Sequence, residues 1–205
     1  MERFKNKYRI ATTRLQNWDY RWAGAYFITV CTQNRLHYFG EIKNGQMQLS
    51  PIGVIADVLW HEIKNHTKNV ELGEFIVMPN HIYGVLIIID NNDTINADAH
   101  VETGHTLSLR GDIALSLRGR VRGLQTIGQQ RFQNIGKNSI SSIVGSYKSA
   151  VTKHAHRLGF DFVWQRLFHD RIIRNENSLH RITNYIRLNP ENWQKDTYFK
   201  IEEPP

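Results

Sequence analysis

Two apolar runs separated by a proline constrain the fold of this chain more than any other stretch. Residues 75–90 read FIVMPNHIYGVLIIID. The runs Phe75–Met78 and Val85–Ile89 are rich in β-branched residues, as buried strands are. Pro79 has no N–H to donate to a sheet, so it marks a break between them. The stretch predicts two strands on either side of that break.

Polar side chains stand at the head of the second predicted strand. His81 and Tyr83 are two residues apart, so they project from the same face of the strand, and Ile82 faces the other way. An imidazole and a phenol side by side in so apolar a strand indicate a functional role for the two side chains. We interpret this pair as the floor of an active site.

The rest of the chain predicts an α+β fold in one domain over residues 1–205, an antiparallel sheet with helices mainly on one face. The expected elements are a strand over Gly24–Thr32, a hairpin over Leu36–Leu49 with its turn at Asn44-Gly45, a helix from Ser50-Pro51 to Lys64-Asn65, strands over Val70–Met78 and His81–Asp90, a helix from Ser139 to about Leu158, short strands over Phe160–Trp164 and His169–Ile173, and a last helix from Asn175 to Asn189.

The charge balance favours a polyanionic partner. Lysine and arginine number 26 against 19 acidic residues, a net charge of +7. Nucleic acid is the simplest such partner, and a solvated basic surface is the alternative. The single cysteine, Cys31, cannot form an internal disulfide. We expect no signal peptide and no membrane span, because no apolar run is long enough, and we expect a cytoplasmic protein.

Two segments stand apart from the predicted core. Residues 1–23 are basic and aromatic, which fits either an arm on nucleic acid or a tail folded over the sheet edge. Residues 91–137 form a long basic stretch with a short repeat at Leu107–Gly111 and Leu115–Gly119. Its length predicts a mobile insertion. It either contacts a nucleic-acid backbone or has drifted as a tolerant loop.

The last predicted helix carries a second polar pair. Leu179, Ile182 and Ile186 form its apolar stripe, and Tyr185 and Asn189 lie four residues apart at the edge of that stripe. By spacing alone, a packed tyrosine with its hydroxyl in solvent is the commoner situation.

The sequence Met78–Gly84 resembles the MPNHxH signature of the single-tyrosine transposases of the HUH class, and is most similar to the REP-associated tyrosine transposases. The name HUH denotes two histidines separated by one hydrophobic residue. The resemblance covers most of the chain outside residues 91–137. It extends to Gly24–Thr32, Ser139–Lys153, Trp164-Gln165-Arg166 and Ile172–Trp193.

This resemblance implies a ferredoxin-like sheet and the cleavage and rejoining of hairpin-forming single-stranded DNA by a monomer or homodimer. Tyr185 matches the nucleophile that remains linked to the 5′ end. His81, Asn189 and, less directly, Tyr83 match the contacts of a divalent metal, Mg²⁺ or Mn²⁺. Basic residues that we expect to contact phosphate, or else to be solvated, are Lys148, Lys153, Arg166, Arg171 and Arg174.

The chain departs from the family pattern at Tyr83, which stands where the second histidine belongs. A neutral phenol is a poor ligand for a hard cation. Arg171 also stands where we would expect a histidine after His169-Asp170. A catalytically impaired, hairpin-binding protein is therefore the alternative. A third hypothesis is an RNA-binding module that stacks bases on Tyr26 or Phe27.

Overall fold

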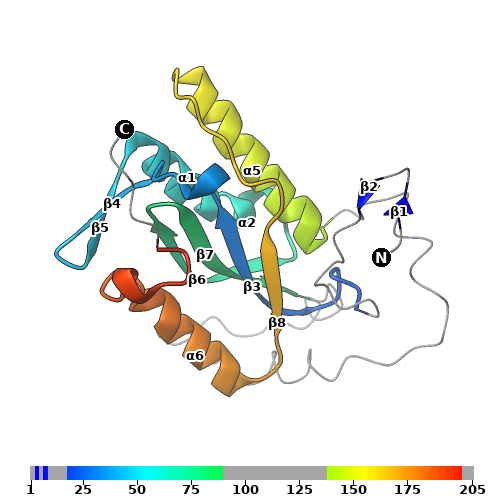
Figure 1. Cartoon of the computed structure of the whole chain (residues 1–205). Coiled ribbons are helices and arrows are strands. Elements are labelled where there is room, and N and C mark those ends of the chain that lie inside the picture. Colours follow the sequence, from blue (N-terminus) through cyan, green and yellow to red (C-terminus); the bar gives the residue numbers. More distant parts are fainter. Residues whose placement is uncertain (1–2, 5–6, 9–17, 90–137, 200–205) are drawn as a thin grey trace.

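A four-stranded antiparallel sheet forms the middle layer of the protein (Figure 1). Its strand order is β6 (Val70–Met78), β7 (His81–Ile88), β3 (Gly24–Cys31) and β8 (His169–Ile173). The computed structural model describes residues 3–4, 7–8, 18–89 and 138–199. The predicted insertion 91–137 and most of the predicted arm 1–23 lie outside the described residues.

The two apolar runs of residues 75–90 form β7 and the second half of β6, as predicted. The strands make a tight hairpin in which Met78 pairs with His81 across the turn Pro79-Asn80. Pro79 lies in the turn, where the ladder loses nothing from its missing N–H. Strand β7 also pairs along its whole length with β3, with Cys31 opposite His81. Because it is paired on both sides and covered on both faces, nearly all of β7 is buried.

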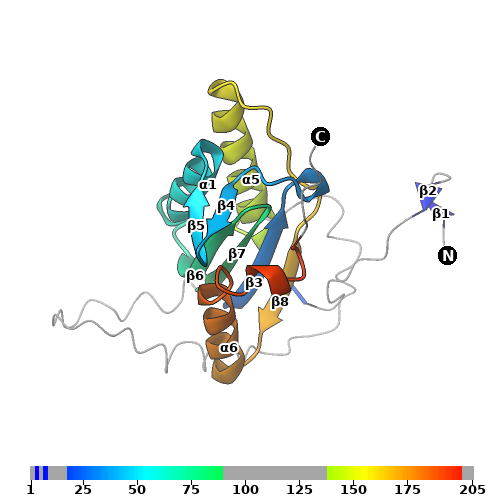
Figure 2. The same cartoon turned by 60° about the vertical axis from the view of Figure 1, so that its left-hand side comes forward.

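Helices α1 (Pro51–His61) and α5 (Ile140–Arg157) cover one face of the sheet, and the short α2 (Ile63–His66) follows α1 (Figures 1 and 2). Ser50 caps α1 as predicted, because its hydroxyl oxygen accepts the Gly53 N–H at 3.1 Å. The apolar core on this face includes Ile28, Val30, Ile82 and Leu86 from the sheet and Ala56, Trp60, Val144, Tyr147 and Val151 from the helices.

One close contact holds α1 against the sheet. Trp60 lies directly on Gly84 of β7, and a Cβ atom at position 84 would overlap the indole ring. The same indole stacks on Phe75 of β6, with ring centroids 4.7 Å apart. A glycine is therefore needed here for close approach rather than for a turn.

Helix α6 (Glu176–Arg187) and the following 3₁₀ turn η3 (Trp193–Lys195) lie on the other face of the sheet (Figure 1). Asn175 caps α6 as predicted, since its side chain accepts the Ser178 N–H at 2.8 Å. The helix ends at Arg187, so Asn189 lies beyond it rather than inside it as predicted. A second apolar cluster fills this face and consists of Ala25, Met78, Tyr83, Val85, Ile173, Ile186 and Trp193.

The smaller elements precede and follow β3 in the sequence. Strands β4 (Gly40–Lys43) and β5 (Gln46–Leu49) form the predicted hairpin, and positive φ angles at Asn44 (52°) and Gly45 (72°) make its turn. A short 3₁₀ turn, η1 (Gln33–Arg35), follows β3. Near the N-terminus the two-residue strands β1 (Arg3–Phe4) and β2 (Lys7–Tyr8) pair with each other.

The prediction of a strand over Phe160–Trp164 is wrong. In this segment only Trp164 forms an isolated bridge, with Thr32 just after β3. Phe162 and Trp164 are both buried, which gives the segment the alternating pattern of a strand. The chain turns away into η1 directly after Thr32, so β3 offers no further partners for a ladder. In the described part of the chain, no helix has the length and apolarity to cross a bilayer.

Candidate active site

His81 is oriented by the residue before it. Asn80 donates through Nδ2 to the backbone carbonyls of Arg35 at 3.2 Å and Tyr198 at 3.0 Å. Both amide hydrogens are then used, so Oδ1 is the atom that faces His81 Nδ1, 2.8 Å away. A carbonyl oxygen only accepts, so Nδ1 carries the hydrogen and Nε2 carries the lone pair. The asparagine of the motif thereby sets the tautomer of the histidine.

His81 and Tyr83 share one face of β7, as predicted. Their ring centroids are 4.4 Å apart, and both side chains are almost fully buried. Tyr83 also stacks on Phe27 of β3 at 5.4 Å, with the ring planes 27° apart. Ile82 belongs to the apolar core on the opposite face. The pair therefore lies on the face of the sheet that carries α6.

Tyr185 reaches this pair from α6. Its hydroxyl oxygen lies 2.9 Å from that of Tyr83, and it donates to Asp196 Oδ2 at 2.7 Å. Asn189 donates through Nδ2 to the same carboxylate oxygen at 2.8 Å. Tyr185 remains 43% exposed, so a ligand in solution can reach the phenol while its hydroxyl points inward. The two polar pairs predicted from sequence, His81 with Tyr83 and Tyr185 with Asn189, meet in one site.

Asp196 lies at the centre of this site, and sequence reasoning missed it. It follows η3 and is only 9% exposed. Besides the bonds from Asn189 and Tyr185 it lies 3.0 Å from the Tyr83 hydroxyl, and its other oxygen accepts the Tyr198 N–H at 2.7 Å. A single aspartate in a short C-terminal segment belongs to no local motif, so the sequence held no signal for its role.

Burial determines the protonation of the site. It lowers the pKa of His81, which keeps the imidazole neutral. Burial and the neighbouring Asp196 carboxylate raise the pKa of Tyr185 to about 12. Burial also raises the pKa of Tyr83 far above its ordinary value. For Asp196, burial opposes ionisation, but hydrogen bonds from Asn189 and Tyr185 outweigh it and lower the pKa. The site thus holds two neutral phenols and one carboxylate.

Two buried ligand atoms in the site have no hydrogen-bond partner within the described residues, His81 Nε2 and Asn189 Oδ1. An imidazole lone pair and an amide oxygen are both groups that divalent cations accept. The two residues therefore fit the metal role that the family resemblance implies for them. Over the ranges 18–89 and 138–199 there is no group of three His, Cys, Asp or Glu residues placed to hold a metal. A cation here would thus depend on the amide of Asn189.

Three of the five predicted phosphate contacts are exposed at different places on the molecule. Arg171 of β8 pairs with Phe27 in the sheet, so it points to the face that carries Tyr83. Arg174 is exposed between β8 and α6, near the same face. Lys153 is exposed on α5, on the opposite side of the sheet. The fold brings Arg171 to the candidate site and does not bring Lys153 there.

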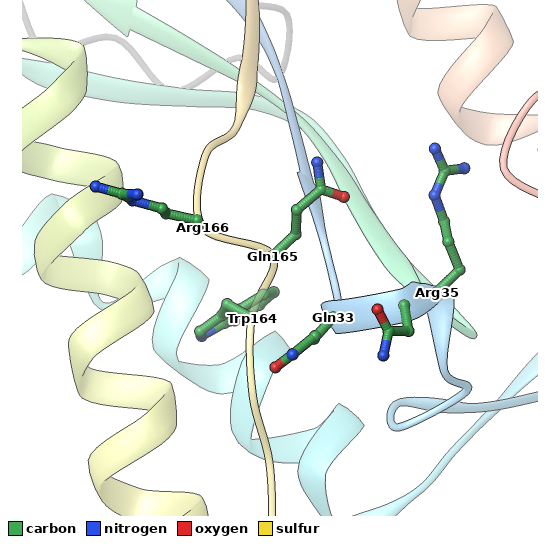
Figure 3. Close-up of a pocket in the computed structure, with 6 residues that line it drawn as sticks. Gln33, Arg35, Trp164, Gln165 and Arg166 are labelled. Carbon is green, nitrogen blue, oxygen red and sulfur yellow. The ribbon is translucent and has the colours of Figure 1, made fainter. Parts of the chain in front are cut away.

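The other two line or support a polar hollow between η1 and the segment 164–166 (Figure 3). The hollow has a volume of about 390 Å³, with Arg35 and Arg166 on its two sides. Lys148 does not point into solvent, since Nζ donates to the Gln165 carbonyl at 2.6 Å. The residues that line the hollow are Gln33, Asn34, Arg35, Trp164, Gln165 and Arg166.

Tyr26 and Phe27, the proposed stacking residues of an RNA-binding module, are both packed inside the protein. Tyr26 is fully buried in the α1–α5 core, where its hydroxyl donates to the Trp22 carbonyl at 2.8 Å. Phe27 packs against both Tyr83 and Tyr185, with ring centroids 5.4 Å and 6.4 Å away. Tyr26 therefore offers no face to a base, and Phe27 is part of the tyrosine site.

The chain resembles a solved structure described as a REP-associated tyrosine transposase bound to a REP hairpin. The two superpose with a TM-score of 0.52 over 90% of this chain and 74% of the other, at 16% sequence identity. The chain has a REP-associated tyrosine transposase fold. The ferredoxin-like arrangement expected from sequence is thus confirmed. A similarity to a candidate transposase of Deinococcus radiodurans is weaker, with a TM-score of 0.37 and 13% identity.

One relative is close in sequence to this transposase-fold protein. It is an uncharacterized protein of Haemophilus influenzae, 34% identical over 187 residues, which are 91% of each chain. The two proteins belong to one family. No family model matches the chain.

Proposed function

We propose that this protein cleaves and rejoins single-stranded DNA that folds into hairpins, with Tyr185 as the nucleophile. The observation that carries the proposal is the position of Tyr185, half exposed on α6 with its hydroxyl against the motif strand and Asp196. The shared fold supports DNA as the substrate class, since the solved relative is described as bound to a REP hairpin. The net charge of +7 suits the same partner.

In the proposed reaction the Tyr185 oxygen attacks the scissile phosphorus. A bond forms between that oxygen and phosphorus, and the bond from phosphorus to the 3′ oxygen breaks. The phenolic proton passes to solvent, and the released 3′ oxygen takes up a proton from water. The 5′ end remains on Tyr185. Rejoining reverses these steps and needs no ATP, because the phosphotyrosine conserves the energy of the phosphodiester.

The phenol needs assistance to react near neutral pH, because its pKa is raised to about 12. In the proposal, His81 and Asn189 hold a divalent cation, which would neutralise charge on the phosphate. Arg171 binds the DNA backbone on the same face of the sheet. Phe27 holds the rings of Tyr83 and Tyr185 in place through its contacts with both.

A second candidate function is hairpin binding without cleavage, and Tyr83 favours it. The residue that matches the second histidine of the motif is a buried neutral phenol that contacts Tyr185 and Asp196. A neutral phenol is a much weaker ligand for a divalent cation than an imidazole is. Replacing Tyr83→His separates the two candidates: a strong gain in cleavage means that the native site is impaired.

The experiment that tests the first proposal uses hairpin DNA from the flanks of the protein's own gene, labelled at the 5′ or 3′ end. The purified protein is incubated with it, with and without Mn²⁺ or Mg²⁺, and analysed on a denaturing gel. We expect a covalent adduct in wild type and its loss, by about 10³-fold or more, in Tyr185→Phe.

A matched control is Tyr38→Phe, because Tyr38 packs against Phe162 in the α1–α5 core and away from the site. It should form the adduct like wild type, and Tyr185→Phe should still bind the hairpin. Tight binding of wild type without any adduct in either metal would reject cleavage and support the second candidate.

A further inference from the structure

We infer that Asp196 is the anionic ligand of a divalent cation in this site and takes the place of the histidine that the motif lacks. The three ligands would come from three places in the chain, His81 at the start of β7, Asn189 beyond α6 and Asp196 beyond η3. This inference rests on the proposed function, which gives the reason why the site would bind a cation. It concerns residues of this chain that no sequence motif joins.

The first argument is that the ligand atoms are available. His81 Nε2 carries a lone pair, because Asn80 fixes the hydrogen on Nδ1, and it has no partner among the described residues. Asn189 Oδ1 is likewise buried and unpaired within the described residues, while its Nδ2 donates to Asp196 at 2.8 Å. A half-turn of this amide would direct Oδ1 towards the carboxylate. Two acceptors face each other favourably only when a cation lies between them.

The second argument is a shortage of hydrogens around Asp196. The hydroxyl oxygens of Tyr83 and Tyr185 and the Oδ2 atom of Asp196 lie 2.7–3.0 Å from one another. Each phenol has one hydrogen, so two hydrogens serve three short contacts between oxygen atoms. A cation bound at Oδ2 removes this shortage, because a water on the metal supplies further hydrogens to the phenol oxygens.

The third argument is charge. The Asp196 carboxylate accepts hydrogen bonds from Asn189, Tyr185 and the Tyr198 backbone, as an ionised group does. Among the described residues, no lysine, arginine or histidine forms an ion pair with it. A buried unpaired anion is costly, and beside the nucleophile it repels the phosphate of DNA. A divalent cation changes the sign of this charge, which makes the site attract the substrate.

Metal binding can be measured directly, without DNA. Mn²⁺ is titrated into the full chain, and the free ion is followed by its EPR signal. Asp196→Asn keeps the size of the side chain and removes the charge, so we expect Mn²⁺ affinity at least about tenfold below wild type. Asp161→Asn is the matched control, because Asp161 is exposed beyond α5. It should bind Mn²⁺ like wild type.

A purely structural role for Asp196 is distinguished by rescue. Tyr83→His restores the second histidine of the motif, so adding it to Asp196→Asn should recover most of the lost Mn²⁺ affinity. If Asp196 only supported the hydrogen-bond network, Tyr83→His would recover none. Equal Mn²⁺ affinity in wild type and Asp196→Asn would overturn the inference, and so would the absence of Mn²⁺ binding by wild type.

A measurement on wild type covers the case in which Asp196→Asn does not fold. In ¹³C-labelled protein, substoichiometric Mn²⁺ should broaden the carboxylate signal of Asp196 and leave that of Asp161 sharp. Broadening of neither signal would reject the site. The DNA adduct is assayed in parallel: an adduct without metal dependence would support the proposed function and reject this inference. Mn²⁺ binding through Asp196 without an adduct would do the reverse.

Discussion

At the residue scale, the site is defined by which atoms of each side chain are already bonded. Asn80 uses both amide hydrogens on backbone carbonyls, and so it can only accept from His81. That leaves Nε2 of His81 as a buried acceptor without a partner in the described part of the chain. Tyr83, by contrast, has its oxygen within 3.0 Å of both Tyr185 and Asp196. The Tyr83 hydroxyl is thus part of a hydrogen-bond network, whereas His81 keeps an available lone pair.

A prediction at this scale concerns the contact of Gly84 with Trp60. A methyl group at position 84 would overlap the indole, which is fully buried and stacked on Phe75, so it cannot move freely. We expect Gly84→Ala to lower the free energy of unfolding by about 1–3 kcal/mol, measured by urea denaturation. An unchanged urea midpoint would show that α1 can move off the sheet at little cost.

The control for that prediction is another glycine. Gly145 lies inside α5 with no atom near the place where a Cβ would stand. Alanine is the better helix former, so Gly145→Ala should raise the free energy of unfolding by up to about 1 kcal/mol. If the free energy of unfolding falls in Gly84→Ala and rises in Gly145→Ala, the loss at position 84 is due to the overlap with Trp60.

At the scale of elements, α6 and the segment after it bring the site together. Ile186 of α6 is fully buried against the sheet, which places its neighbour Tyr185 over the motif strand. The helix ends at Arg187, and the chain then returns through η3 so that Asp196 meets Tyr185 and Asn189. The end of α6 therefore matters as much to the site as the helix itself.

The start of α6 allows a test of how the helix is stabilised. The Asn175 side chain accepts the Ser178 N–H at 2.8 Å, and Asn175→Ala removes this cap. We expect a loss of about 1 kcal/mol in the free energy of unfolding, measured by thermal or urea denaturation. Asn177→Ala, an exposed change within the first turn, should cost nothing because alanine suits a helix better. Similar losses in both variants would contradict the capping role.

At the scale of the whole molecule, the sheet separates two faces with different tasks. The α1–α5 face holds the larger apolar core, and the α6 face holds the polar residues that meet at Asp196. The candidate site and Arg171 share the second face (Figure 1). Under the proposed function, DNA bound for cleavage lies on the α6 face, although basic residues occur on both.

This arrangement predicts which basic residues contact DNA. Arg171→Ala should weaken hairpin binding and reduce the slope of log affinity against log salt by about 1, since one phosphate contact is lost. Lys153→Ala, on the opposite side of the sheet, should change neither quantity. Fluorescence anisotropy at several salt concentrations measures both. A larger effect of Lys153→Ala would place the DNA on the α5 face instead.

Features that depend on residues close together in the chain could be predicted from the sequence. The β6–β7 hairpin, the turn at Asn44-Gly45 and the caps Ser50 and Asn175 all follow from local backbone chemistry and side-chain periodicity. The shared face of His81 and Tyr83 follows from the period of a strand. These features were predictable because their causes lie within a few residues of one another.

Features that depend on residues far apart in the chain could not be predicted in this way. Asp196 meets Tyr83 across 113 positions, and no local pattern records such a contact. Phe160–Trp164 has the alternation of a strand but lacks a partner, and Lys148 is occupied by a backbone carbonyl that the sequence does not reveal. Strand pairing and long-range hydrogen bonds join residues that are distant in sequence, so they form only when the whole chain has folded.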